Sequence, residues 1–550
     1  TVTGAGANIS FTGNASAAGA LLGVDVGSIN LSNGASLSLI SNNKITQAGT
    51  IANAANTNGA ASSILFDATS GTNASAVTIG TLTVAAATST SDINLLVKSK
   101  GSSVTASGPL ATSAIPLPGT IVFDNTNGGV VTQATAVAGV GLTFNGGGVF
   151  GSKGITLTGV SNNNTAITSN QVMTSALGSV VLTGSTLTAG NLWGINATGT
   201  LTGKSITVTA TNNTTGTLTT GGAVNLGALS ILAGGTNLTV TGNNSNQAAQ
   251  GIVASGAISL ASGSGLFFTS NNLINQTGAI SVAANVSGTA SNLIFDTTTG
   301  TSDSSITTGN FTFVTGSTSD INLTVISKGS ALSLGTVGTS ALVLPGVLTV
   351  DNTNGGTVTA ANAISGIGLL INRGAIYAGK GVVLKGVANA NNAIYVSSAV
   401  TAANGDIVIN ALGNSATTYS APGVGGTLTA TNGSVSLTSV STTGSAINIV
   451  TGATITAKTG ITLNATSTTA ATVATVDVLT VTGAGANISF TGNASAAGAL
   501  LGVDVGSINL SNGASLSLIS NNKITQAGTI ANAANTNGAA SSILFDATSG

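Results

Sequence analysis

One long block of sequence occurs twice in this chain without a substitution. Residues 1–71 recur at residues 480–550, at an offset of 479 residues. Selection for a fold alone does not keep neutral surface positions identical over such a length, whereas a recent tandem duplication does. We therefore interpret residues 1–479 as one full tandem repeat unit and residues 480–550 as the start of the next, identical unit. This organisation predicts a structural or surface fibre.

A second, degenerate repeat lies inside the 479-residue unit. The triplet Ser41-Asn42-Asn43 returns as Ser270-Asn271-Asn272 and as Ser520-Asn521-Asn522, at offsets of 229 and 250 residues. Single-residue insertions between the two sub-repeats belong in turns, where they cost little. Further phrases return at offsets that fall from 229 to 227: Ile64–Asp67 at Leu293–Asp296, Ser91–Leu95 at Ser319–Leu323, Asp124–Gly129 at Asp351–Gly356, and Lys153-Gly154 at Lys380-Gly381.

Short stretches that alternate apolar and polar residues recur roughly every 18–28 residues, as in the coils of a solenoid. In Ser205–Thr209 this alternation puts Ile206 and Val208 on one face of a strand and the threonines on the other. Clusters of Asn and Gly separate the stretches and suit tight corners. No sustained apolar stripe at helical spacing is present, so helix is poorly supported.

A single coil of this kind is too short to bury its own apolar face, whereas stacked coils share one continuous core. With about 24 residues per coil and about 4.8 Å between coils, the unit would contain about 20 coils and extend over about 95 Å. A β-sandwich array would instead show a repeat of about 100 residues. We therefore predict an all-β fold, a right-handed parallel β-helix (β-solenoid), continuous as a rod and without caps in this sequence.

The composition removes several classes of function. Charged residues make up 4% of the chain and the net charge is −1, so rows of phosphates cannot be neutralised and no nucleic-acid partner is expected. No apolar run approaches the roughly 18–20 residues of a transmembrane helix, and no membrane insertion is expected. The abundance of β-branched residues argues against disorder.

No catalytic constellation is visible in the sequence. His and Cys are absent, and the charged residues are scattered, with Asp92 near Lys98 and Lys100 and Asp320 near Lys328. Sugar-cleaving β-helix enzymes need clustered carboxylates, which cannot be assembled here. We therefore predict that the protein is not an enzyme and has no catalytic, cofactor-binding or metal-binding residues and no cofactor.

Two segments are candidates for calcium, which many secreted β-solenoids bind. Asp124–Asn127 and Asp351–Asn354 offer oxygen atoms, but each contains only one carboxylate, and hard cations usually need more negative charge. The following glycine pairs favour a simpler interpretation, in which these segments form tight corners.

Thr-x-Thr triplets suggest a second hypothesis, because flat ladders of such triplets occur in ice-binding β-solenoids. Threonine also has high strand propensity, and the irregular spacing predicts that the triplets do not align. The triplets are Thr156–Thr158, Thr207–Thr209, Thr217–Thr219, Thr239–Thr241 and Thr427–Thr429.

Aromatic residues are scarce. Phe267-Phe268 is expected to straddle a strand, with one ring inside. Four other residues are too sparse to form a sugar-stacking platform: Trp193, Tyr377, Tyr395 and Tyr419.

Three segments carry a family resemblance. Residues 452–465, 178–184 and 203–210 resemble the coils of filamentous-haemagglutinin-like and autotransporter-type adhesins of Gram-negative bacteria. The resemblance is compositional and periodic and runs along the whole chain. It implies a right-handed parallel β-helix, export across the outer membrane, and a role in adhesion or surface fibres.

These observations together predict an extracellular structural repeat protein at the bacterial cell surface, which forms a stiff fibre, a sheath or an adhesin stalk, as in biofilms. Its expected partner is itself, through end-to-end continuation, a covalent tandem array or lateral packing. One alternative is an adhesin that binds a glycan or host surface directly through its outer Thr/Asn ladders. Another is an ice-binding β-solenoid.

Overall fold

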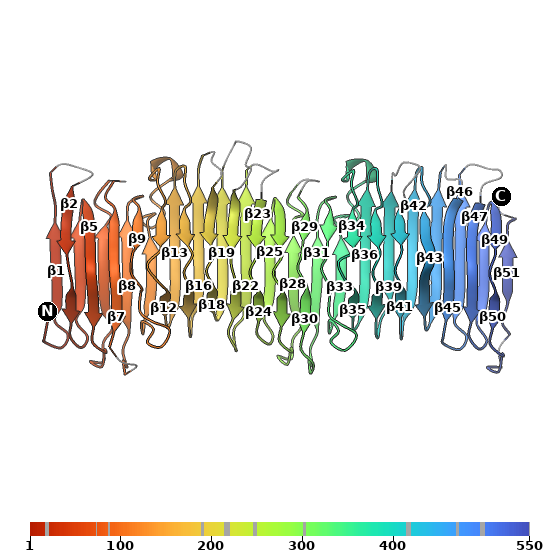
Figure 1. Ribbon diagram of the computed structural model, residues 1–550, viewed down its shortest axis with the longest axis horizontal. Helices are drawn as coiled ribbons and strands as arrows, with labels where there is room; N and C mark the ends of the chain where they lie inside the picture. The colour runs from red at the N-terminus through yellow and green to blue at the C-terminus, as the bar shows by residue number, and fades with distance from the viewer. Residues whose placement is uncertain are drawn as a thin grey trace. The chain divides into compact units, whose positions relative to one another are not determined.

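A computed structural model of the chain describes residues 1–16, 21–72, 74–85, 88–188, 192–213, 221–245, 250–300, 304–413, 420–468, 472–495, 501–538 and 540–548. These residues group into two compact units, unit 1 (residues 1–278) and unit 2 (residues 279–550). Within each unit, parallel strands stack coil upon coil into a β-solenoid (Figure 1). This confirms the predicted all-β solenoid. None of the described helices is long and apolar enough to cross a membrane.

Three rows of strands run through unit 1: after each row-A strand the chain passes through row B and then row C, although the coil that contains Leu110 has only isolated bridges in row C. Row A consists of β1 (Asn8–Gly13), β4 (Ser36–Ser41), β6 (Ser62–Ala68), β8 (Ile93–Ser99), β10 (Thr120–Asp124), β13 (Gly154–Ser161), β16 (Ser179–Thr186), β19 (Ser205–Asn212), β22 (Asn237–Asn244) and β25 (Gly265–Ser270). Rows B and C consist of β2 (Leu22–Val26), β3 (Ile29–Leu31), β5 (Lys44–Asn53), β7 (Val77–Val84), β9 (Val104–Ala106), β11 (Leu142–Phe144), β12 (Val149–Gly151), β14 (Ile167–Ser169), β15 (Met173–Ser175), β17 (Trp193–Ala197), β18 (Leu201–Gly203), β20 (Gly222–Leu226), β21 (Leu229–Ile231), β23 (Gln250–Ala254), β24 (Ile258–Leu260) and β26 (Leu273–Gln276).

Unit 2 is built in the same way. Its row A consists of β28 (Ser291–Asp296), β31 (Ile321–Ile326), β33 (Val347–Asp351), β36 (Gly381–Ala388), β39 (Ile407–Gly413), β42 (Ser434–Ser441), β44 (Gly460–Ser467), β46 (Asn487–Ala494), β48 (Ser515–Ser520) and β51 (Ile543–Asp546). Its other strands are β27 (Ile280–Val282), β29 (Ile306–Thr307), β30 (Phe311–Phe313), β32 (Leu332–Ser333), β34 (Leu369–Ile371), β35 (Ile376–Ala378), β37 (Ile394–Val396), β38 (Val400–Ala402), β40 (Pro422–Val424), β41 (Leu428–Ala430), β43 (Ile447–Ala457), β45 (Thr472–Val481), β47 (Leu501–Leu510), β49 (Lys523–Gln526) and β50 (Ile530–Asn532). One short 3-10 helix lies in each unit, η1 (Gln133–Thr135) and η2 (Ala360–Asn362).

The coils are longer than the sequence predicted, and their length varies. Ile155 pairs in register with Val180 of the next coil and with Ile121 of the previous coil. Along the chain, Ile121 is farther from Ile155 than Val180 is, so these two coils differ in length. Corner loops account for the excess, because a loop can lengthen without disturbing the strand register. Residues 1–479 therefore hold seventeen described row-A strands, β1 to β44, instead of the expected value of about 20 coils.

The inward side chains form continuous ladders. In row A of unit 1, Leu39, Phe66, Val97 and Phe123 occupy successive register positions, and all four are fully buried. Each such side chain contributes about 1.5–3 kcal/mol through burial. The inward positions Ile206 and Val208, and Phe268 beside the outward Phe267, follow the predicted alternation.

Buried asparagines hold the corners of both units in matching ways. The Asn56 side chain donates from Nδ2 to the carbonyls of Ala60, at 2.8 Å, and Asp92, at 2.9 Å. Asn285, its counterpart in the second sub-repeat, donates to Thr289 and Asp320, both at 2.8 Å. Since an unpaired buried carbonyl is costly, these amides make each corner a defined structure.

Candidate functional site

The two segments considered for calcium are hydrogen-bonded turns. The Asp124 carboxylate accepts from the Thr126 amide at 2.7 Å, from the Thr126 hydroxyl at 2.5 Å and from the Gly128 amide at 2.9 Å. In unit 2, Asp351 accepts from the amide and hydroxyl of Thr353 at 2.7 and 2.5 Å. These carboxylates are therefore engaged by donors of their own turns. Among the described residues no three acidic, His or Cys side chains gather as metal ligands.

The same aspartate turn recurs along row A. In each case an Asp at or near the end of a strand accepts from the amide and hydroxyl of the Thr two residues later: Asp67–Thr69, Asp124–Thr126, Asp296–Thr298, Asp351–Thr353 and Asp546–Thr548. At Asp546 the hydroxyl and the amide of Thr548 hold the pKa of the carboxyl below its usual value. Five of the twelve acidic side chains thus accept hydrogen bonds within corner turns.

The acidic residues near lysines in the sequence have other partners in space. Asp92 pairs with Lys153, with 2.7 Å between Oδ1 and Nζ, and Asp320 pairs with Lys380 at 2.8 Å. Each lysine precedes a row-A strand two coils beyond its aspartate. The two pairs occupy matching places in the sub-repeats, and both are half-exposed. They stabilise the outer face and do not form a cluster of catalytic groups.

The three Thr-x-Thr triplets of unit 1 that the structure describes align, which contradicts the expectation from their spacing. Strands β13, β16, β19, β22 and β25 pair so that one outward column contains five threonines: Thr158, Thr183, Thr209, Thr241 and Thr269. A neighbouring column contains Thr156, Val181, Thr207, Thr239 and Phe267. Eight of these ten positions carry a hydroxyl group, Val181 and Phe267 interrupt the second column, and neither column has a charged side chain.

A shorter threonine column lies on unit 2. Thr429, from the last of the five triplets, pairs in register with Thr401 on one side and Thr456 on the other. The triplet at 217–219 lies outside the described residues. These columns could not be recognised in the sequence, because loops of different length separate the strands. The strand register, and not the spacing of residues along the chain, determines which side chains are adjacent.

One corner loop in each unit folds over the outer face of row A. In unit 1, Val131 and Ala136 of the loop pack on Val160 of β13. In unit 2, Val358 and Ala363 pack on Val387 of β36. Each loop turns through an asparagine with positive φ, 49° at Asn127 and 48° at Asn354, and the glycines that follow accept the same conformation.

Hydrogen bonds of the Gln133 side chain hold the unit-1 loop in place. Its side-chain Nε2 donates to the Ser185 hydroxyl and, at 3.0 Å, to the Thr186 carbonyl, while its Oε1 accepts from Asn213 at 2.8 Å. The corresponding residue of unit 2 is Ala360, which cannot make these bonds. Leu412 and Val440 take the register places of Ser185 and Thr211 and are 36% and 40% exposed.

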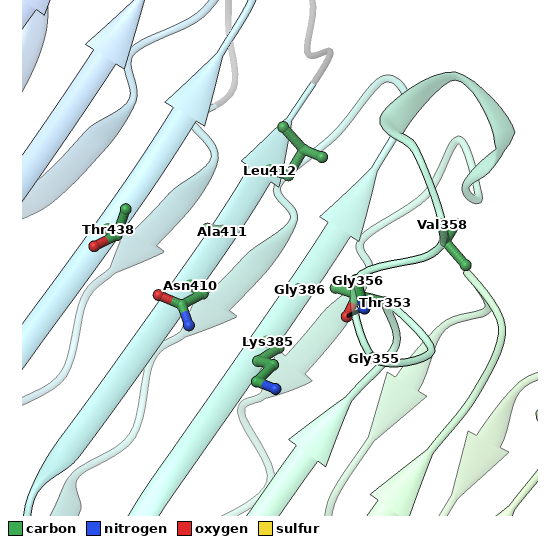
Figure 2. Close-up of a pocket in the computed structure, with 10 residues that line it drawn as sticks. All are labelled: Thr353, Gly355, Gly356, Val358, Lys385, Gly386, Asn410, Ala411, Leu412 and Thr438. Atoms are coloured by element: carbon green, nitrogen blue, oxygen red, sulfur yellow. Dashed lines mark hydrogen bonds between the residues drawn. The ribbon is translucent and has the colours of Figure 1, made fainter.

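Unit 2 consequently has an open groove beside its loop, with a volume of about 350 Å³. Figure 2 shows Lys385, Asn410 and Thr438 on successive strands of its floor, with the turn at Gly355 on one side. The Lys385 ammonium lies 3.6 Å from Asp351, a loose ion pair. The groove therefore combines polar groups with the exposed Leu412 side chain, and its geometry suits binding better than proton transfer.

The aromatic residues considered for sugar stacking lie apart. Trp193 pairs in register with Gly222, Tyr377 with Thr401 and Tyr395 with Gly423, and Tyr419 lies outside the described residues. None of the three described residues has an aromatic register partner on that side, so they do not form a row.

Comparison with known protein families, with curated proteins and with solved structures finds no match to this chain.

Proposed function

We propose that this chain is an extracellular structural repeat protein, which forms a stiff fibre, a sheath or an adhesin stalk on a bacterial cell surface. The observation that carries the proposal is the phase of the duplicated block. Ile9 pairs with Leu37 in the first copy of the block, and Ile488 pairs with Leu516 in the second, so the register inside the two copies is the same. A further copy of the unit would thus continue the stack without a register shift, as a length-setting repeat requires.

The physical properties of the coil agree with a mechanical role. Parallel pairing satisfies the backbone hydrogen bonds of each strand on both sides, which resists proteolysis and local opening. The outer face consists mainly of Thr, Ser and Asn, so it is hydrated and almost uncharged, and neighbouring rods can pack laterally. The resemblance to filamentous-haemagglutinin-like adhesins supports the surface location.

Arrays of increasing length test this proposal. Residues 1–550 are compared with a chain that carries one additional copy of residues 1–479, by small-angle X-ray scattering and electron microscopy. We expect the additional unit to lengthen the particle by about 80 Å, from about 4.8 Å for each of its coils, without a change in cross-sectional radius. A larger cross-section, or flexible beads, would contradict the proposal.

The aligned threonines support a second candidate function, ice binding. The two columns on β13, β16, β19, β22 and β25 form an uncharged array of hydroxyl groups, interrupted at Val181 and Phe267. Its spacings are about 4.8 Å between strands and about 6.6 Å along each strand. The paired substitution Thr183→Lys and Thr209→Lys should abolish any thermal hysteresis of the chain. The control Ser259→Lys, on the row-C strand β24, should leave it unchanged. Absence of thermal hysteresis in the parent chain would eliminate this candidate.

A further inference from the structure

A separate hollow lies on row B of unit 2, between β37, β40 and β43, with a volume of about 360 Å³. Tyr395, Gly423 and Asn448 form one outward register row across these three strands. Asn391 and Asn392 border the row, and the exposed Val450 adds an apolar wall. The hollow thus contains one aromatic ring, several amides and no charged side chain among its lining residues.

Gly423 has no side chain, which lets neighbouring side chains approach its backbone closely. A Cβ atom at this position would lie 2.4 Å from Nδ2 of Asn392 and 3.2 Å from Cδ2 of Tyr395. Both side chains therefore lie against the bare backbone of β40. A glycine inside a strand often marks such a close approach by another group or by a ligand.

The corresponding row of unit 1 has different residues. It contains Thr168, Asn196 and Asn225 in the same register, and Asn225 donates from Nδ2 to Oδ1 of Asn196 at 2.9 Å. Thus unit 1 has threonine in place of Tyr395 and a second asparagine in place of Gly423. One hydrogen bond joins its two amides across the strands.

Two amides of the hollow in unit 2 can bond a ligand. The side chains of Asn448 and Asn392 have no hydrogen-bond partner among the described residues, although Asn392 is only 8% exposed. Their amide atoms are open to the hollow and to solvent. A ligand that supplies hydroxyl groups can therefore replace water as their hydrogen-bond partner.

We propose that this hollow binds one neutral pyranose residue of a polysaccharide. The Tyr395 ring offers an apolar face with a polar hydroxyl at its tip, which matches the C–H face and rim of a pyranose. The asparagine amides offer both donors and acceptors to sugar hydroxyls. A charged ligand is disfavoured, because no lining residue would compensate its charge. This binding site does not depend on the proposed stalk function. It would give the stalk a specific ligand.

Saturation-transfer NMR on the whole 550-residue chain tests the proposal. The probes are maltotetraose, cellotetraose, laminaritetraose and mannotetraose, with tetragalacturonate as the acidic control. We expect saturation of the ring C–H protons of at least one neutral probe and a weaker effect on tetragalacturonate. Titration calorimetry then gives the affinity for the bound probe.

Three variants locate the site. Tyr395→Thr, which introduces the residue of unit 1, should weaken binding by about tenfold. Gly423→Asn places a side chain in the space against which Asn392 and Tyr395 lie, and it should abolish binding. The matched control Tyr377→Thr, on β35 outside the hollow, should bind like the parent chain.

Three results would overturn the proposal: no saturation of any neutral probe at millimolar concentration, equal binding by Tyr395→Thr, or preference for tetragalacturonate. Tyr395→Phe keeps the ring and should bind within a few-fold of the parent, which separates loss of the ring from loss of folding. The length measurements on tandem arrays are unaffected by these variants, so failure here and failure of the stalk proposal are distinguishable.

Discussion

The two sub-repeats keep the same buried frame and differ on the outer face. Asn125 of unit 1 and Asn352 of unit 2 make equivalent bonds to the backbone of the next row-A strand. The ion pairs of Lys153 and Lys380 are also equivalent. In contrast, Gln133 closes the loop of unit 1, whereas Ala360 leaves a groove in unit 2.

This difference shows where a duplicated solenoid can change. Inward and corner side chains contact the coils on both sides, so a substitution there leaves a cavity or an unpaired backbone group. An outward side chain contacts mainly its register neighbours and solvent. Substitution of two or three such neighbours therefore opens or closes a site without disturbing the stack, as the rows at Asn196 and Gly423 illustrate.

Removal of a corner asparagine should have the largest effect, and the effect should be equal in both units. Asn125→Ala and Asn352→Ala each remove the bond to the amide of Val160 or Val387, 2.7 Å long in both cases, and leave buried backbone groups unpaired. We expect a local loss of about 3 kcal/mol, or about hundredfold faster amide exchange at Val160 and Val387. Unequal effects would show that the two frames are not equivalent.

Replacement of Asn53 should stabilise unit 1. Its side chain is buried in the core between Leu31 and Val84, and neither its amide nitrogen nor its oxygen has a hydrogen-bond partner. The corresponding residue of the second sub-repeat is Val282. Asn53→Val should therefore raise the local stability of β5 by about 1–2 kcal/mol, measured by hydrogen exchange. Faster exchange in β5 would refute this explanation.

Loss of the Gln133 bonds should make the unit-1 loop resemble its counterpart. Gln133→Ala removes three hydrogen bonds at the edge of the molecule, and we expect a local cost of about 1 kcal/mol. The amide of Val131, which donates to the Thr126 carbonyl at 2.9 Å, should then exchange as fast as that of Val358. If Val131 remains as protected as in the parent, packing on Val160 alone holds the loop.

The smallest effect is expected from the surface ion pairs. The lysine and aspartate side chains are 54% and 31% exposed in one pair and 57% and 32% in the other. Lys153→Gln and Lys380→Gln should each cost about 0.5 kcal/mol or less, and the difference from the parent should vanish at about 1 M salt. A larger cost that persists in high salt would indicate a structural role.

The sequence predicted the strands well and the sites poorly. Alternation identified Ile206 and Val208 as inward residues, because side-chain direction in a strand depends only on local geometry. It could not align Thr183 with Thr209, nor place Tyr395 and Asn448 on either side of Gly423 in one register row. Loops of variable length separate these residues, and only the stacking of coils determines their register.

The duplicated block separates the two levels of information. Leu39 and Leu518 occupy the same place in the two copies, and both are fully buried. Leu39 lies between Phe11 and Phe66 in register, and Leu518 lies between Phe490 and Phe545. The sequence by itself determined that these side chains lie on the apolar face of a strand. Only the tertiary structure decided which side chains cover them, because burial in a parallel stack comes from the coils on either side.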